Sequence, residues 1–264
     1  MPLSTTLLVS ALDPSLGRVD KASLPQQTLM ELFIEKMENK EALFRNGEHP
    51  ADITKWPNLS FHPDTRAVTA ISWQFKNLAG SISLEWLPAT VGELYLVYNR
   101  LSGSLDLSLL PPPMTVCFLE RNQFSGTIRL DCLPERLRNL NLSHNSFTGS
   151  LCLERLPKTL ESLYLQENQL SGTVELTQLP KHLKHLSLGE NQFHGTVDAT
   201  QLPQGLRKLY LHSNSFQGKT DLSLLPDTLE LFYVNDTALE GEIRLKDQKP
   251  NFCIDKSNVT IVVE

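Results

Sequence analysis

The residues of this chain best suited to metal binding or catalysis are a pair of histidines and four cysteines. His182 and His185 form an HxxH pair. The repeat described below puts His185 on a strand and His182 in the loop before it, and no cysteine or carboxylate recurs where it would converge with them. We therefore predict no metal site and no bound cofactor.

The four cysteines, Cys117, Cys132, Cys152 and Cys253, show no CxxC spacing, which favours free thiols in a reducing compartment. Cys117 occupies a position that leucine fills in other repeats, so we expect it in the core. Cys132 and Cys152 fall at different positions of adjacent repeats, which disfavours a disulfide between them. The chain also has no phosphate-binding loop and no Ser-His-Asp set that the repeat would assemble. It is therefore predicted not to be an enzyme.

The pattern that must position every side chain is an internal repeat of 23 residues. Leucine is over-represented, at 49 of 264 residues, and glycine, proline and asparagine each recur with the same period. The repeated unit reads LPxxLxxLxLxxNxLxGxLxLxx, as in residues 156–178. The glycines are Gly80, Gly103, Gly126, Gly149, Gly172, Gly195, Gly218 and Gly241, and the asparagines are Asn99, Asn122, Asn145, Asn168, Asn191 and Asn214.

Each position of the unit has a structural role. The alternation at 163–165 predicts a short strand with leucines inward and Tyr164 outward. Asn168 follows, where its side chain can bond the backbone of neighbouring turns inside the core. Gly172 permits a backbone conformation closed to other residues. A second alternation at 173–176 predicts another short strand on the opposite side, and the LP pair after it prevents a long helix.

These features predict a leucine-rich repeat solenoid, a right-handed β-rich superhelix in which stacked turns share one core. Eight turns are expected over residues 65–248, with a parallel sheet on the concave side and short strands on the convex side. Residues 1–64 form an N-terminal capping region with a helix at about 23–40, because Leu29, Phe33 and Met37 share one helical face. Residues 249–264 form a C-terminal cap, in which 259–263 adds a strand or covers the last turn.

Charge and hydropathy exclude several classes of partner. The formal net charge of −6 leaves no basic stripe for nucleic acid. No apolar run approaches the roughly 18 residues that a membrane-spanning helix needs. The apolar run at 7–12 is short and has no Lys or Arg before it, which disfavours a secretory signal. We therefore expect a cytoplasmic monomer whose partner is a protein.

The unit that joins LPxxLxxLxL to NxLxGxLxL resembles the leucine-rich repeats common in kinetoplastid (trypanosomatid) protozoa, and the resemblance includes 42–45 and 52–56. It implies the solenoid fold but no specific activity. Bacterial effector ubiquitin ligases also use LP-rich repeats, but theirs are shorter and accompany a catalytic domain for which no residues remain here. Plant receptor ectodomains share the NxLxGxI half, seen at 122–128, but they are secreted and have paired cysteines in their caps.

Leucine-rich repeat proteins mostly bind proteins, often through the concave face, and here all five tyrosines fall on that predicted face. Tyrosine and arginine are enriched in binding hot spots. Aromatic residues on adjacent strands also stabilise a sheet, by about 0.2–1 kcal/mol per pair, so a purely structural role stays open. The predicted partner-binding residues are Tyr95, Tyr98, Phe118, Arg121, His144, Tyr164, Glu167, His185, Tyr210, His212 and Tyr233.

Two functional hypotheses follow. The first is a non-enzymatic protein-interaction module that binds a protein partner through its concave tyrosine-rich face. The second rests on the parasite setting of the family it resembles, and is a secreted or surface-exposed virulence or host-recognition factor exported without a signal peptide. A glycan at Asn141, a sequon residue in the middle of the face, would block binding there, which disfavours the second hypothesis.

Overall fold

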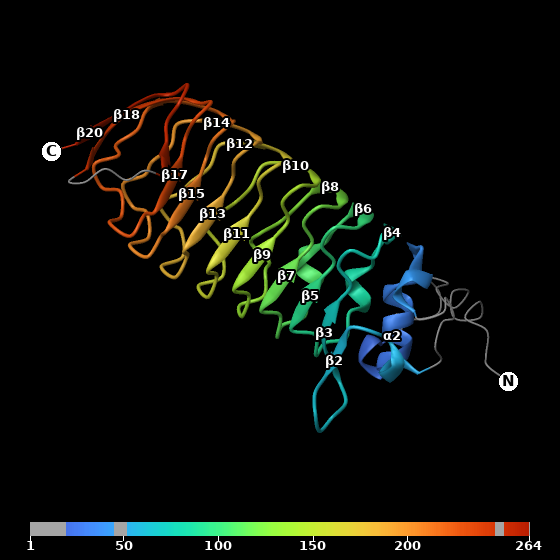
Figure 1. The fold of residues 1–264 in the computed structure, drawn as a ribbon. Helices are drawn as coiled ribbons and strands as arrows, with labels where there is room; N and C mark the ends of the chain where they lie inside the picture. The colour runs from blue at the N-terminus through green and yellow to red at the C-terminus, as the bar shows by residue number, and fades with distance from the viewer. Residues whose placement is uncertain (1–19, 45–51, 246–250, 264) are drawn as a thin grey trace.

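The fold is a solenoid built from two β-sheets (Figure 1). The computed structural model describes residues 20–44, 52–245 and 251–263. Each turn of the chain contributes one short strand to each sheet, so the turns stack along one axis from the N-terminal helix to the C-terminal strands. This is the leucine-rich repeat solenoid that the 23-residue period predicts.

Both sheets are parallel except at their N-terminal edges, where β2 and β1 pair antiparallel with β3 and β4. The first sheet, expected to be the concave one, consists of β2 Leu59–Phe61, β3 Val68–Ser72, β5 Glu93–Tyr95, β7 Val116–Phe118, β9 Asn139–Asn141, β11 Ser162–Tyr164, β13 His185–Ser187, β15 Lys208–Tyr210, β17 Leu231–Tyr233 and β19 Phe252–Cys253. The second sheet consists of β1 Met37–Glu38, β4 Ala79–Ser81, β6 Arg100–Ser104, β8 Gln123–Thr127, β10 Ser146–Gly149, β12 Gln169–Gly172, β14 Gln192–Gly195, β16 Ser215–Lys219, β18 Ala238–Leu245 and β20 Asn258–Val263. Short 3-10 helices are η1 Lys21–Ser23, η2 Lys40–Leu43, η4 Ile53–Lys55, η5 Leu84–Trp86 and η6 Leu107–Leu109.

The second strand of each turn lies earlier in the repeat than the alternation indicates. The predicted strand at 173–176 was wrong, because these residues belong to neither sheet and the strand is β12. Val174 and Leu176 alternate with polar residues because both are buried in the core, and an extended segment can do this without pairing. Gly172 ends the strand in the left-handed region, at φ +88°, which favours glycine and turns the chain away from the sheet.

A continuous apolar core fills the space between the two sheets. Leu163, Leu165 and Leu170 of one middle turn are each 0% exposed. Residues at the same repeat position stack on one another, as do the rings of Phe193 and Phe216, whose centroids lie 6.2 Å apart. Each turn therefore buries its side chains against the turns on either side of it.

One asparagine in each middle turn bonds to backbone groups that the core would otherwise leave unpaired. Nδ2 of Asn168 donates to the carbonyl oxygens of Leu142 and Leu165 at 3.0 and 3.1 Å. Its Oδ1 accepts from the amide of Phe147 at 3.0 Å. The prediction for this position is confirmed, and the pattern recurs at Asn122, Asn145, Asn191 and Asn214.

We expect Asn168→Ala to lower the free energy of unfolding by about 1–3 kcal/mol, because alanine strands the donor of Phe147 and several carbonyl oxygens inside the solenoid. Urea denaturation followed by circular dichroism measures this loss. Asn141→Ala is the matched control, since the Asn141 side chain only accepts bonds from the backbone and hydroxyl of its neighbour Ser143. A loss for Asn168→Ala no larger than that of the control would contradict the prediction.

The N-terminal cap contains a shorter helix than the sequence predicts. Helix α2 covers Gln26–Phe33, whereas the expected helix at 23–40 would have included Met37. Met37 instead begins β1, which pairs with β4 at the edge of the second sheet. It is buried there, at 3% exposure, so Met37 reaches the core as its spacing from Phe33 predicts, but without a continuous helix.

The cap closes the core with aromatic side chains. Trp73, in the first turn, is fully buried, and its ring centroid lies 6.2 Å from that of Phe33 and 6.3 Å from that of Trp56. Its indole Nε1 donates to the carbonyl oxygen of Pro57 at 3.0 Å. The first turn therefore covers the end of the leucine core with one large side chain, which the helix then packs against.

At the other end, β20 pairs in parallel with β18 along six residue pairs, from Glu240 with Asn258 to Leu245 with Val263. This confirms that the C-terminal tail adds a final strand. No helix within the described ranges is both long enough and apolar enough to cross a membrane. The apolar run at 7–12 lies outside the described residues.

Candidate binding face

The outer side of the first sheet carries a row of aromatic side chains. Tyr95, Phe118, Tyr164, Tyr210 and Tyr233 are the last residues of β5, β7, β11, β15 and β17, and each is half-buried. The strands pair at an offset of one repeat, which aligns these residues across the sheet. Strands β9 and β13 interrupt the row with a polar residue. We call this surface the tyrosine face.

A first aromatic cluster lies at the N-terminal end of the tyrosine face. The rings of Phe75 and Tyr98 stack with centroids 4.8 Å apart, and the guanidinium carbon of Arg121 lies 4.9 Å from the centre of the Tyr98 ring. Beside them, Tyr95 and Phe118 meet edge to face at 5.5 Å. Phe75 is 69% exposed and Tyr98 46%, so this cluster presents large apolar area to a partner. Phe75 was not among the predicted binding residues, although it shares the repeat position of Tyr98.

A second aromatic cluster lies near the C-terminal end of the same face. The rings of Tyr210 and Tyr233 meet edge to face at 5.1 Å, and the His212 ring lies 6.0 Å from that of Tyr233. Tyr164 and His185 lie beside them, with ring centroids 6.2 Å apart. The structure therefore brings these five predicted residues together in two adjacent groups, one of three rings and one of two.

Four of the predicted binding residues lie in the turns that follow the strands, where the backbone is left-handed. Tyr98, Arg121, His144 and Glu167 have φ between +53° and +56°, the left-handed region that residues other than glycine rarely adopt. The repeat imposes this conformation at the same place in every turn. Nδ1 of His144 lies 2.6 Å from Oε2 of Glu167, which makes this edge of the tyrosine face polar.

A column of polar side chains lies two residues after each position of the aromatic row and one residue before each left-handed position. Several of these side chains have unpaired atoms. Five side-chain oxygen or nitrogen atoms are buried without a hydrogen-bond partner in the described part of the chain, and all five belong to this repeat position. They are Gln74 Oε1, Glu120 Oε2, Gln166 Oε1, His212 Nδ1 and Asn235 Oδ1. We call them the unpaired column.

Four of the five atoms lie in every second turn, and the turns between them carry Val97, Ser143 or Gly189. Long side chains therefore alternate with short ones; a Cβ at Gly189 would collide with the imidazole of His212. Of this column, the sequence identified only His212. The residue types vary from turn to turn, so only the atomic contacts reveal what they share.

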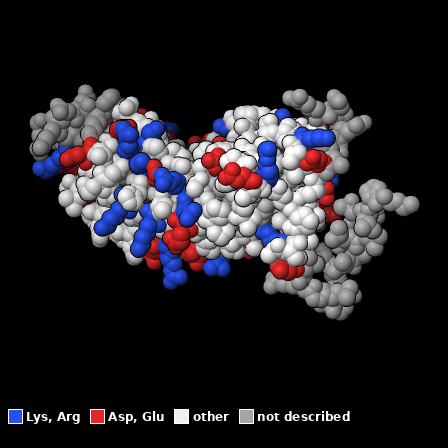
Figure 2. Space-filling model, turned by 90° about the horizontal axis from the view of Figure 1, so that it is seen from below, with Lys and Arg blue, Asp and Glu red and all other residues white. Residues whose placement is uncertain are grey.

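Electrostatics differ between the two ends of the strands. Nδ1 of His185, at the start of β13, lies 3.1 Å from both Ser162 Oγ and Tyr164 Oη. Burial lowers the pKa of His185, and the nearby charges of Lys208 and Arg207 lower it further, so its imidazole is neutral at neutral pH. Figure 2 views the molecule from below and shows Lys and Arg side chains gathered toward its C-terminal half.

Cys117 lies in the core, as its place at a leucine position of the repeat predicts. Cys117 is fully buried, and burial raises the pKa of its thiol to about 12, so it is protonated and enclosed in the core. The four cysteines are free thiols. Among the residues that the structure describes, no group of three or more His, Cys, Asp or Glu side chains is arranged to hold a metal ion.

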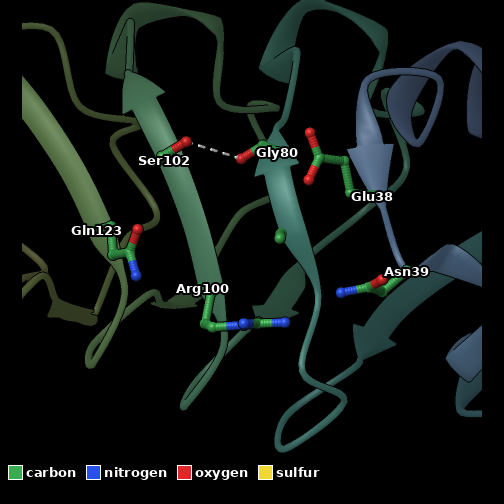
Figure 3. Close-up of a pocket in the computed structure, with 7 residues that line it drawn as sticks. Glu38, Asn39, Gly80, Arg100, Ser102 and Gln123 are labelled. Carbon is green, nitrogen blue, oxygen red and sulfur yellow. Dashed lines mark hydrogen bonds between the residues drawn. The ribbon is translucent and has the colours of Figure 1, made fainter.

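A hollow of about 290 Å³ lies on the second sheet, away from the tyrosine face (Figure 3). Its charged and amide groups are those of Glu38, Asn39, Arg100 and Gln123. Ser102 also lines it, and its Oγ donates to the carbonyl oxygen of Gly80 at 3.2 Å. The hollow is polar and contains no nucleophile paired with a base, and none of the predicted binding residues lines it.

Comparisons with known proteins agree on the fold. The family model described as Leucine Rich Repeat matches residues 136–154. No curated protein matches the chain. Among solved structures, the chain is similar to the plant peptide hormone receptor RGFR1 in complex with RGF2, with 26% identity and a TM-score of 0.58 over 67% of this chain and 30% of that chain.

The chain is also similar to YopM from Yersinia enterocolitica, with 26% identity and a TM-score of 0.51 over 67% of this chain and 36% of that chain. A third structure, PEPR1–AtPEP1, shares 23% identity with a TM-score of 0.66 over 90% of this chain and 34% of that chain. The chain thus spans about a third of the length of these three proteins. The resemblance to kinetoplastid repeats is tested by none of them and stays a prediction.

Proposed function

We propose that this chain is a non-enzymatic protein-interaction module that holds an extended segment of a protein partner along its tyrosine face. The solenoid exposes two aromatic clusters on a rigid sheet, and such side chains supply large contact area with few rotamers to freeze. The sheet itself is preformed by the stacked core, so little ordering is required of this protein on binding.

The observation that supports this proposal most is the unpaired column. A buried polar atom without a partner costs about 1–3 kcal/mol, so most buried polar atoms in proteins are paired. Here five such atoms fall in one column of one face, between the aromatic row and the left-handed positions that follow it. Three of the five are carboxamide oxygens and one is a carboxylate oxygen, so N–H donors that a partner laid along the column would pair them once these side chains rotated toward the surface.

The similar structures add support of a general kind. RGFR1 is a plant peptide hormone receptor in complex with RGF2, and it shares 26% identity with this chain. A leucine-rich repeat scaffold of this type therefore suits the recognition of a polypeptide. Because this chain spans only 30% of that receptor, the partner is proposed from the face and not transferred from the receptor.

Replacing Tyr164, Tyr210 and Tyr233 together by alanine is expected to abolish capture of the partner from a lysate of the source cells. The three rings form much of the second aromatic cluster, and removal of a hot-spot residue weakens binding by about 2 kcal/mol or more. Affinity capture followed by mass spectrometry compares the variant with the wild type, and circular dichroism verifies that the variant is folded.

The matched control replaces the exposed residues Gln123, Gln169 and Gln192 of the second sheet by alanine. It should capture the same proteins as the wild type. If the folded tyrosine variant captures them as well, the binding site lies elsewhere. If its unfolding free energy falls by several kcal/mol, the tyrosines serve mainly to stabilise the sheet.

The alternative, a secreted or surface-exposed host-recognition factor exported without a signal peptide, remains a second proposal. Asn141 lies on the tyrosine face, and its Oδ1 accepts from the backbone N–H and the hydroxyl of Ser143 at 3.0 and 2.7 Å. A glycan on Asn141 would cover the face. We therefore favour a cytoplasmic module, and the glycosylation state of the natural protein distinguishes the two proposals.

A further inference from the structure

A strip of positive charge lies along the edge of the first sheet where the strands begin, although the net charge of −6 predicts no basic stripe. We call this strip the basic edge. It is formed by the loops before β9, β11, β13 and β15, in four consecutive turns, and it is visible from below as the blue side chains toward the C-terminal half of the molecule (Figure 2). Its members are Arg136, Arg138, Lys158, Lys181, Lys184 and Arg207, all exposed.

The charges of the basic edge are only partly neutralised. Glu161 lies between two of its cations, with Oε1 3.3 Å from Arg138 and Oε2 2.7 Å from Lys184. Arg207 pairs with Glu230 of the following turn. Arg136, Lys158 and Lys181 form no ion pair within the described part of the chain. Three adjacent turns therefore each present an unpaired cation, although the first of them also exposes the carboxylate of Glu135 and the whole protein has a formal charge of −6.

The charges next to the strip define its length. The next loop toward the C-terminus carries Asp227 and Glu230, and the loop before β7 on the other side begins with the uncharged run 111–113. Four turns at a strand spacing of about 4.8 Å give a strip roughly 15–20 Å long. An extended peptide rises about 3.3 Å per residue, so five or six residues span it.

The basic edge is continuous with the tyrosine face. Lys184 immediately precedes His185 of the second aromatic cluster, and Arg207 immediately precedes Lys208, the first residue of β15. The positive potential reaches the face itself, since the charges of Lys208, Arg207 and Lys184 all lower the pKa of His185. A partner held on the tyrosine face therefore passes directly beside this strip.

We infer that the basic edge docks an acidic, extended segment of the partner protein, about five or six residues long, rich in Asp or Glu. The inference rests on the proposed function and specifies the charge of the partner. A peptide fits better than a nucleic acid for two reasons. The net charge of −6 repels a long polyanion, and the strip is flanked by Asp227 and Glu230 instead of continuing around the molecule.

The test uses the full chain and a fluorescein-labelled hexaglutamate peptide, with binding followed by fluorescence anisotropy at about 50 and 150 mM salt. Reversing the three unpaired charges, in Arg136→Glu/Lys158→Glu/Lys181→Glu, is expected to weaken binding about tenfold or more at the lower salt concentration. The matched control, Lys36→Glu/Lys55→Glu/Lys219→Glu, makes the same change in net charge at three exposed lysines elsewhere. It should weaken binding by no more than about threefold, because exposed charges beyond a Debye length are largely screened.

Two results would overturn the inference. One is equal loss of binding in the edge variant and the control, which would reduce the effect to net charge. The other is tighter binding of a hexathymidylate oligonucleotide than of hexaglutamate, which would assign the strip to nucleic acid. The Tyr164→Ala/Tyr210→Ala/Tyr233→Ala variant should bind hexaglutamate like the wild type. Failure of the proposed function appears instead in partner capture, so the two failures are distinguishable.

Discussion

Trp73→Ala is expected to lower the free energy of unfolding by about 3–5 kcal/mol, the range for removal of a fully buried Trp or Phe side chain. Trp73 is 0% exposed and touches both parts of the N-terminal cap, through Phe33 of α2 and through Trp56. The substitution also removes the indole donor from the carbonyl oxygen of Pro57, which lies 3.0 Å away. Because the cap packs on this side chain, the cap should lose its order first.

Two measurements check this prediction. Chemical denaturation gives the change in unfolding free energy, and hydrogen exchange should show protection lost first over residues 26–44. Phe75→Ala is the matched control, since Phe75 lies two residues away, is 69% exposed and stacks only on Tyr98. It should cost no more than about 1.5 kcal/mol. A loss for Trp73→Ala as small as that of Phe75→Ala would mean that the cap does not depend on this contact.

The sequence predicts those parts of the fold whose residue types recur at the same position in most turns. Three such features recur every 23 residues, and the structure has all of them. They are the buried leucines at 163 and 165, an asparagine that pairs backbone groups, and a glycine at φ +88°. It misplaced the second strand because Val174 and Leu176 are buried whether or not their segment pairs with a neighbour. It overextended the cap helix because Met37 is buried in a strand as readily as in a helix.

The candidate site divides in the same way. The aromatic row is predictable, because strands paired at an offset of one repeat must align residues that are 23 apart, such as Tyr210 and Tyr233. The unpaired column is not predictable. Whether Gln166 Oε1 finds a partner depends on rotamers and on the size of its neighbours in adjacent turns, and its residue types share no pattern. The basic edge is partly predictable. The period predicts that residues 23 apart, such as Glu161 and Lys184, lie on adjacent turns, but it does not predict which of them form ion pairs.

Leu163→Ala is expected to lower the free energy of unfolding by about 2–5 kcal/mol, because it opens a cavity in the middle of the stacked core. Leu163 is 0% exposed and lies in register between Leu140 and Leu186, so the cavity weakens the contact with both adjacent turns. Leu224→Ala, at a leucine that is 56% exposed, should change the stability by about 0.5 kcal/mol or less. If the two variants lose equal stability, the inward register is wrong.

Because Leu163 lies in a middle turn, Leu163→Ala also tests how strongly the two halves of the solenoid are coupled during unfolding. In a solenoid each turn contacts only its neighbours, so a cavity in a middle turn lowers the coupling between the two halves. All three tryptophans lie at or before residue 86, so their fluorescence reports the N-terminal part, whereas circular dichroism reports the whole chain. If the coupling remains strong, both signals shift to the same lower urea midpoint. If Leu163 contributes most of the coupling, the fluorescence midpoint separates from the circular dichroism midpoint, and the separation shows that the two halves no longer unfold together.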